Sequence, residues 1–183
     1  EQCGAPHTLY AAPATHFAAS FIGTPPMQLL RLVRHGDALV PAGQSGPALA
    51  AAGARNTALL GLRPEHVRAV PPTSLGAVLA RVSAIEYLGA DTLVACTLGD
   101  AGTITTRVPG HRPFAVGDAI GLQWAATDQH LFDATSGERL VTGAAGGVAI
   151  DAAESVVAPK TAHAPARPLP GATVMLQNPE QHV

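Results

Sequence analysis

The clearest pattern in the chain is an alternation of apolar with polar or small residues between Gly76 and Leu140. Three sets of larger or apolar side chains recur at every second position: Val78, Ala80 and Val82; Ile104, Thr106 and Val108; Ile120, Leu122 and Trp124. This period places each set on one face of a β-strand. Turn-forming stretches separate the runs, namely "LGAD" (88–91), "GDAG" (99–102), "PGHRP" (109–113), "VGD" (116–118) and "DATSG" (133–137). Short strands at this spacing predict an all-β fold, a small antiparallel barrel similar to an oligonucleotide-binding (OB) fold.

The N-terminal region has apolar residues at helical rather than strand spacing. Pro13 can occupy the first position of a helix, and Gly23 followed by "TPPM" favours an extended exit from it. We therefore predict one short N-terminal helix, Pro13–Phe21, within a linker that covers residues 1–30.

Two other regions have weak patterns. Residues 34–57 are rich in glycine, alanine and proline, which predicts a weak hairpin or a loop. Residues 141–183 contain five prolines and no aromatic residue, so we expect a low-complexity, disordered tail, in which only "ATVML" could pair as a strand. The barrel is then expected to cover residues 31–140.

Composition excludes several classes of protein. The formal net charge of −2 provides no basic surface for nucleic acid or anionic lipid. Cys3 and Cys96 lie far apart, as in proteins whose thiols stay reduced, so we expect no disulfide framework. Neither a signal-peptide pattern nor a run of about 20 apolar residues is present, and we expect a protein that does not span a membrane.

Candidate catalytic and metal-binding chemistry is sparse. The eight histidines form no i, i+4 pair and have no cysteine-rich partner cluster, so no metal site is expected. The sequence also lacks a phosphate-binding glycine loop ending in Lys-Ser or Lys-Thr and a Gly-x-Ser-x-Gly nucleophile motif. We therefore predict no catalytic residues.

The stretch "GLRPEHV" (61–67) concentrates potentially reactive side chains. Glu65 and His66 could form an acid–base pair. The structural interpretation is favoured, because Pro64 restricts the backbone and Arg63 and Glu65 can fasten a strand end to a neighbouring loop through charge-assisted hydrogen bonds.

Two binding functions remain as alternatives for a small barrel. Nucleic-acid binding is disfavoured, because residues 76–140 carry four arginines against seven acidic residues, and their aromatic residues are spread out and expected in the core. A small-ligand or oxyanion sensor would need cationic side chains, for which Arg63 and the turn residues His111 and Arg112 are the candidates.

Several motifs together resemble one family. "EQCGAPHTLYAAPATHFAASFIGTPPMQLL", "GLRPEH", "IEYLGADTL" and "HLFDATSGERL" resemble, in order, the segment after the nucleotide-binding domain and the regulatory barrel, called the transport-associated OB (TOBE) domain, in ATPase subunits of maltose-type ABC importers. "LGAD" is most similar to the subunit that energises sn-glycerol-3-phosphate import, and Gln28 stands where the family usually has asparagine. The resemblance marks these residues as family landmarks, structural or regulatory in role: Gly61, Arg63, Pro64, Glu65, His66, Leu88, Gly89, His130 and Phe132.

The resemblance implies a regulatory domain that forms a homodimer and thereby holds two ATPase subunits together. The ATP- and Mg-binding motifs would lie in a nucleotide-binding domain absent from this sequence, so the chain itself would need no cofactor. Partners would be the membrane permeases, reached through that domain, and a regulatory protein, but no nucleic acid. The expected location is cytoplasmic, peripheral at the inner face of the cell membrane.

Overall fold

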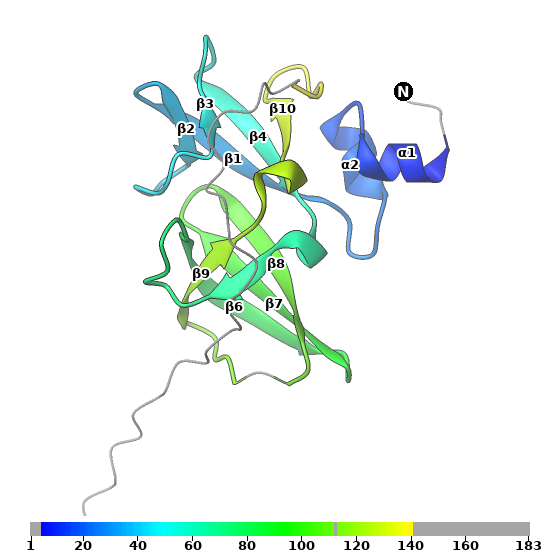
Figure 1. The fold of residues 1–183 in the computed structure, drawn as a ribbon, viewed down its shortest axis with the longest axis vertical. Helices are drawn as coiled ribbons and strands as arrows, with labels where there is room; N and C mark the ends of the chain where they lie inside the picture. The colour runs from blue at the N-terminus through cyan, green and yellow to red at the C-terminus, as the bar shows by residue number, and fades with distance from the viewer. Residues whose placement is uncertain (1–4, 112, 141–183) are drawn as a thin grey trace, which may run out of the picture.

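Antiparallel strands form two five-stranded sheets in the computed structural model, which describes residues 5–111 and 113–140 (Figure 1). The first sheet has the order β10-β4-β1-β2-β3, and its strands are β1 (Gln28–His35), β2 (Ala38–Pro41), β3 (Ala50–Ala51), β4 (Thr57–Leu62) and β10 (His130–Asp133). The second has the order β5-β9-β6-β7-β8, with β5 (Arg68–Val70), β6 (Val78–Tyr87), β7 (Asp91–Leu98), β8 (Gly102–Pro109) and β9 (Ala119–Gln123). The predicted all-β barrel class is confirmed. The predicted tail, 141–183, with its possible strand "ATVML", lies outside the described residues.

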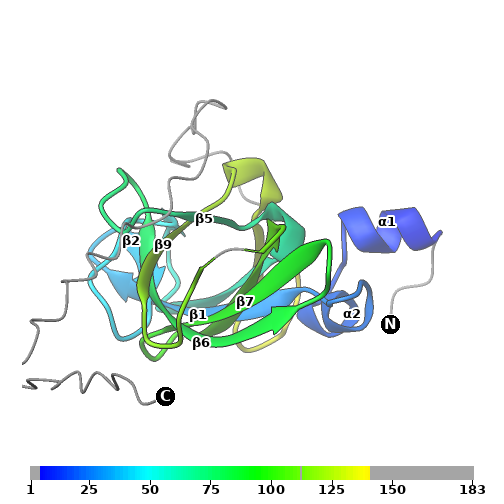
Figure 2. The same ribbon diagram turned by 90° about the horizontal axis from the view of Figure 1, so that it is seen from below.

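Contacts between β1 and β8 join the two sheets. The Arg31 N–H donates to the Ala101 carbonyl at 2.8 Å. The Gln28 amide donates to the Thr105 hydroxyl at 2.8 Å and accepts a hydrogen bond from the Thr105 N–H. Gln28, which departs from the family pattern, therefore pairs through its side chain with the neighbouring strand. Figure 2 shows the strands of both sheets around one interior.

The interior is filled by one apolar cluster with contributions from both sheets. All three sets of side chains identified by the strand alternation are buried, as predicted. Trp124 is anchored as well as buried. With the Gln129 amide oxygen turned toward the indole, Nε1 of Trp124 donates to it at 2.9 Å, and the amide nitrogen donates to the Leu49 carbonyl at 3.1 Å.

The hairpin alternative for residues 34–57 is correct. β1 and β2 pair up to His35 and Ala38, and the two-residue turn between them contains Gly36 at a φ of 62°. A left-handed backbone is easily adopted by glycine, which suits it to this tight turn.

Two helices precede the barrel where one was predicted: α1 (Pro6–Ala11) and α2 (His16–Phe21). The predicted start at Pro13 was wrong, because Thr15 is extended and forms a bridge with Glu138. The Thr15 hydroxyl accepts a hydrogen bond from the Ala18 N–H at 3.1 Å and so caps α2. The signal for α1 was the same one used at Pro13, a proline at the first helical position.

The α2 helix packs on the outer face of the first sheet. Ala19 is buried there with Met27 and Phe132. Of the helices in residues 5–111 and 113–140, none is long and apolar enough to cross a membrane.

Candidate functional site: the Arg63 corner

The motif "RPEH" forms the corner at which the chain leaves the first sheet for the second. β4 ends at Leu62, and a single 3₁₀ turn, η1 (Pro64–His66), leads to Val67 and then β5. Arg63 is extended at the cap of this turn, and buried Pro64 takes its first position. Proline suits that position because its fixed φ matches a helical turn and its missing N–H would have no partner there.

Arg63 is only 1% exposed and attaches the N-terminal helices to this corner. Its guanidinium donates to the Tyr10 carbonyl at 2.6 Å and to the Ile22 carbonyl at 2.9 Å. The guanidinium carbon lies 3.5 Å from the centroid of the Tyr10 ring, a cation–π contact. The Tyr10 hydroxyl in turn donates to the Glu65 carboxylate. We call Arg63, Tyr10 and Glu65 the Arg63 clamp.

The electrostatics of the clamp follow from its surroundings. Burial lowers the pKa of Arg63, while the neighbouring Tyr10 and Glu65 act in the opposite direction. The hydrogen bond to Glu65 is the main cause that raises the pKa of Tyr10. Arginine stays charged under ordinary conditions, so its charge is offset by two carbonyl dipoles, a ring face and a carboxylate linked through the tyrosine hydroxyl. This arrangement suits a structural fastening.

The geometry does not bring Glu65 and His66 together as an acid–base pair. Glu65 accepts from Tyr10, whereas Nδ1 of His66 lies 3.6 Å from a carboxylate oxygen of Asp128. The two side chains therefore have different partners, and a Glu65-polarised imidazole is not formed.

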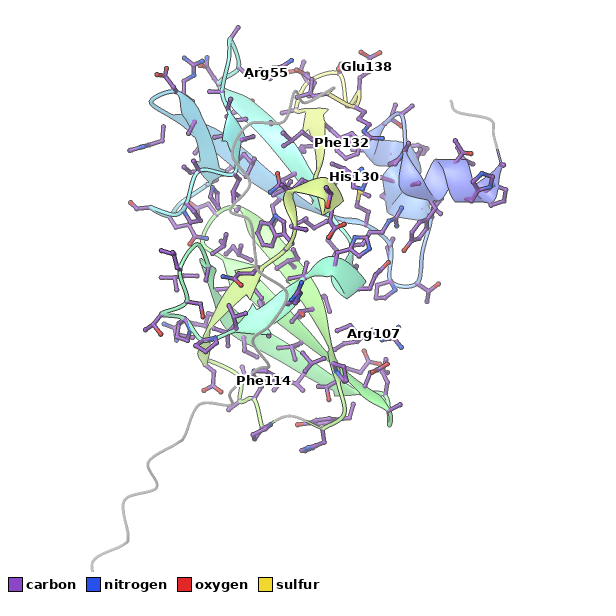
Figure 3. The ribbon with its side chains drawn as sticks, viewed as in Figure 1. Arg55, Arg107, Phe114, His130, Phe132 and Glu138 are labelled. Atoms are coloured by element: carbon purple, nitrogen blue, oxygen red, sulfur yellow. The ribbon has the colours of Figure 1, made fainter. Side chains whose placement is uncertain are left out.

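His130 and Phe132 come from β10, which pairs with β4 directly beside the corner. His130 lies opposite Gly61 and is buried. Burial is the main cause that lowers its pKa to about 4, and the nearby Arg139, Arg63 and His66 add to the effect. His130 is therefore neutral at pH 7. Figure 3 shows His130 and Phe132 next to each other along β10.

Gly61 allows a close approach at this point. A Cβ atom there would lie 2.5 Å from Sδ of Met27 and 2.9 Å from Cε2 of Phe132. Both distances are too short for real contacts, so the absence of a side chain lets Met27 and Phe132 meet over β4.

Leu88 and Gly89 lie elsewhere, in the turn that joins β6 to β7. The Leu88 N–H donates to the Asp91 carbonyl at 2.8 Å, and Gly89 has a φ of 84°. The landmark residues therefore form two groups, the Arg63 corner with β10 and the β6–β7 turn. His111 stacks on Tyr87 beside this turn, with ring centroids 4.7 Å apart, and Arg112 lies outside the described residues.

Metal-binding chemistry is not evident in the part of the chain that the structure describes. No group of three or more His, Cys, Asp and Glu side chains there could hold an ion. Cys96 is a buried thiol in the barrel core, and burial raises its pKa to about 12. Cys3 lies outside the described residues.

Sequence reasoning missed the partners of the corner residues. Tyr10 lies 53 positions before Arg63, and no local period or spacing connects them. Asp128, the partner of His66, lies in the short 3₁₀ turn η2 (Ala126–Asp128) that precedes β10. The signal available was indirect: the tyrosine and the "RPEH" stretch both belong to motifs of the same family resemblance.

Comparison with known proteins identifies relatives of this arrangement. Residues 60–132, from β4 to β10, match the TOBE domain family. Over 140 residues the chain is 41% identical to the sn-glycerol-3-phosphate import ATP-binding protein UgpC of Cereibacter sphaeroides. This alignment covers 76% of this chain and 39% of that protein. It is 42% identical over 145 residues to UgpC 3 of Agrobacterium fabrum, an alignment that covers 76% of this chain and 40% of that protein. It is 37% identical over 149 residues to UgpC of Chromohalobacter salexigens, an alignment that covers 78% of this chain and 40% of that protein.

The chain spans about 40% of the length of these curated relatives. The matches agree with the order of motifs in the sequence and with the barrel in the structure, so the predicted resemblance is confirmed. Residues 60–132 match the TOBE domain family, and over about three quarters of its length the chain is similar to sn-glycerol-3-phosphate import ATP-binding proteins.

Proposed function

We propose that this chain is the regulatory and dimerising domain of the ATP-binding subunit of an ABC importer, for sn-glycerol-3-phosphate or a sugar. The observation that carries the proposal is the TOBE match over residues 60–132, which includes the Arg63 corner and every strand of the second sheet. The names of the relatives support the class of importer and the choice of sn-glycerol-3-phosphate. ATP and Mg would bind in a nucleotide-binding domain whose motifs this sequence does not contain.

The mechanism of such a domain is that of a tether. A contact between two barrels raises the effective concentration of the ATPase halves for each other, so they do not have to meet again in each cycle. The Arg63 clamp would contribute rigidity, because it holds the Tyr10 carbonyl, in the last turn of α1, and the Ile22 carbonyl, at the C-cap of α2, to the barrel. A displacement of the helices would then be transmitted to the barrel.

The surroundings of such a subunit follow from the same proposal. The domain would lie in the cytoplasm, peripheral at the inner face of the membrane, and the permeases would contact the nucleotide-binding domain. A regulatory protein docked on one state of the barrel pair would shift the balance between open and closed importers.

The alternative binding functions have less support. An oxyanion sensor would need a free cation, whereas the Arg63 guanidinium is buried and donates to two carbonyls. For nucleic acid, Arg107 is a poor candidate because its guanidinium lies 2.6 Å from the Asp91 carboxylate. Neither alternative is favoured by a specific observation.

Sedimentation of the full chain at rising concentration tests the proposal. We expect a monomer–dimer equilibrium that short single-stranded DNA does not alter and that salt changes little, since a chain with a formal net charge of −2 has few counterions to release from nucleic acid. A monomer that persists at millimolar concentration would remove the tether. A salt-sensitive complex with DNA would favour the nucleic-acid alternative.

A further inference from the structure

Strand β6 has a free edge over its second half. β9 pairs with β6 along Val78–Arg81, and the turn before β9 extends this contact to Val82, whose N–H donates to the Asp118 carbonyl and whose carbonyl accepts from the Gly117 N–H. By contrast, β7 pairs with β6 as far as Tyr87. Beyond a register shift between Val82 and Ala84, the side of β6 that faces away from β7 has no strand partner among the described residues.

Hydrogen bonds at the β6–β7 turn show which backbone groups point off this edge. The Leu88 N–H donates to the Asp91 carbonyl, and on the other side of β7 the Gly110 N–H donates to the Ala90 carbonyl at 2.7 Å. Hydrogen-bonded and non-hydrogen-bonded pairs alternate along an antiparallel ladder. Ala84, Glu86 and Leu88 therefore bond toward β7, and the N–H and C=O groups of Ile85 and Tyr87 point outward.

The free edge is flanked by exposed apolar side chains. Tyr87 is 55% exposed and Leu88 is 48% exposed. The expectation that the aromatic residues of this region lie in the core was therefore wrong for Tyr87. The Tyr87 ring stacks on His111 with an interplanar angle of 3°, so its position is fixed before any partner arrives. Glu86 carries the single charge between residues 83 and 89. Outward backbone groups beside exposed apolar side chains are the features that strand addition uses.

We propose that this edge of β6 pairs with the same edge of a second copy of the chain, in an antiparallel arrangement about a two-fold axis at Tyr87. The inference rests on the proposed dimerising function and names its surface. A strand edge is self-complementary in this geometry, because each donor of one copy meets the matching acceptor of the other.

Charge selects the position of the axis. An axis at Glu86 would place two carboxylates directly opposite each other, which is unfavourable. An axis at Ile85 would extend the pairing into Ser83, where the register shift bends the strand. An axis at Tyr87 instead pairs the outward groups of the two tyrosines and places Glu86 of each copy opposite Leu88 of the other. The two Tyr87 side chains then lie opposite each other on one face of the paired strands.

A contact of this size is small and should be weak in isolation. It joins few backbone groups and two exposed apolar side chains in each copy, far less than a stable interface of standard size. A weak contact suits a tether between subunits that other domains also hold together.

Sedimentation equilibrium of the full chain and a set of variants tests the surface. Leu88→Asp would place a carboxylate opposite Glu86 of the other copy, where the two negative charges repel. Leu88→Lys would place an ammonium group opposite the same glutamate, where the opposite charges attract. Because the two-fold repeats each pair, we expect L88D to weaken and L88K to tighten the dimer, each by between about 2-fold and 30-fold. The double variant Glu86→Lys with Leu88→Asp should have a dimer dissociation constant equal to or lower than that of the wild-type chain.

A backbone variant addresses the pairing itself. The Tyr87 N–H points away from β7, so Tyr87→Pro leaves the β6–β7 ladder intact and removes a donor from the edge. We expect at least a 10-fold weaker dimer for Y87P than for Tyr87→Thr, which loses the ring but keeps the donor. Leu75→Asp is the matched control, because Leu75 is 90% exposed and lies outside the proposed edge. It should leave the dimer dissociation constant unchanged. Circular dichroism and urea unfolding check that each variant is folded.

The outcomes separate this inference from the proposed function. If the wild-type chain dimerises and the folded L88D, L88K and Y87P variants dimerise equally well, the surface is wrong and the proposed dimerising function stands. If the wild-type chain stays monomeric at millimolar concentration, both are overturned. Charge-dependent shifts of opposite sign at Leu88, with rescue by the double variant, support the β6 edge.

Discussion

Replacing Arg63 with alanine would remove the centre of the clamp. The guanidinium makes two hydrogen bonds to carbonyls and one contact with the Tyr10 ring, all within a buried corner. Hydrogen bonds that involve a charged group contribute about 1.5–3 kcal/mol each. Removing the buried guanidinium also removes the free-energy cost of its desolvation, which offsets part of the loss from these hydrogen bonds. We expect Arg63→Ala to lower the free energy of unfolding by about 3–5 kcal/mol.

Urea unfolding followed by fluorescence measures this loss, because Trp124 is the single tryptophan and is buried in the core. Hydrogen exchange over residues 6–22 reports in parallel whether the helices leave the barrel. Arg63→Lys keeps the charge without the planar fork, so it should lose about half as much, roughly 1.5–3 kcal/mol. Arg68→Ala, at an exposed arginine on β5, is the control and should change the free energy by less than about 0.5 kcal/mol. A change below about 1 kcal/mol for Arg63→Ala, with unchanged exchange in the helices, would refute the clamp.

Four further predictions follow from the core, the corner and the motifs. Trp124→Ala should lower the free energy of unfolding by about 3–5 kcal/mol in urea melts, whereas a loss under about 1 kcal/mol would mean that the indole is not packed. Gly61→Ala should cost about 1–3 kcal/mol, since the new Cβ would meet Met27 and Phe132, and an unchanged melt would show that these side chains can move aside freely. The pKa of His130 is about 4 in the folded chain, against an ordinary value of 6.5. Between these two pH values the unfolded state binds more protons than the folded state. The contribution of His130 to the free energy of unfolding should therefore be complete above pH 6.5 and decrease as the pH falls toward 4. Unfolding at several pH values checks this slope, and His130→Gln should flatten it. Calorimetry with Mg-ATP should give no binding to the chain, and a saturable low-micromolar signal would contradict that expectation.

Local patterns in the sequence were sufficient to predict strands β6, β8 and β9. The alternation at Val78, Ala80 and Val82 was a reliable guide to burial, because a strand's two faces are set by its own period. The hairpin after β1 was also predictable in kind, since glycine next to aspartate between apolar runs favours a tight turn. These features depend on neighbours in the sequence.

The rest depends on contacts between distant segments. The start of α2 was misplaced because Thr15 is held extended opposite Glu138, more than a hundred residues away. The clamp was predicted only as a fastening of the strand end, because the identity of its partners required the helices to be placed on the barrel. The free edge of β6 depends on where β9 stops and on the register shift after Val82.

A chimeric importer tests the central claim most directly. In it, the matching region of the Cereibacter sphaeroides UgpC protein, 41% identical over 140 residues, is replaced by this chain, and uptake of labelled sn-glycerol-3-phosphate is measured in cells that lack the native subunit. The same chimera with Arg63→Ala serves as a control for the clamp. If this chain is the regulatory domain of such a subunit, the chimera will restore uptake and the Arg63→Ala chimera will restore less. A chimera that is expressed, folded and joined to its permeases but imports nothing would contradict the proposal.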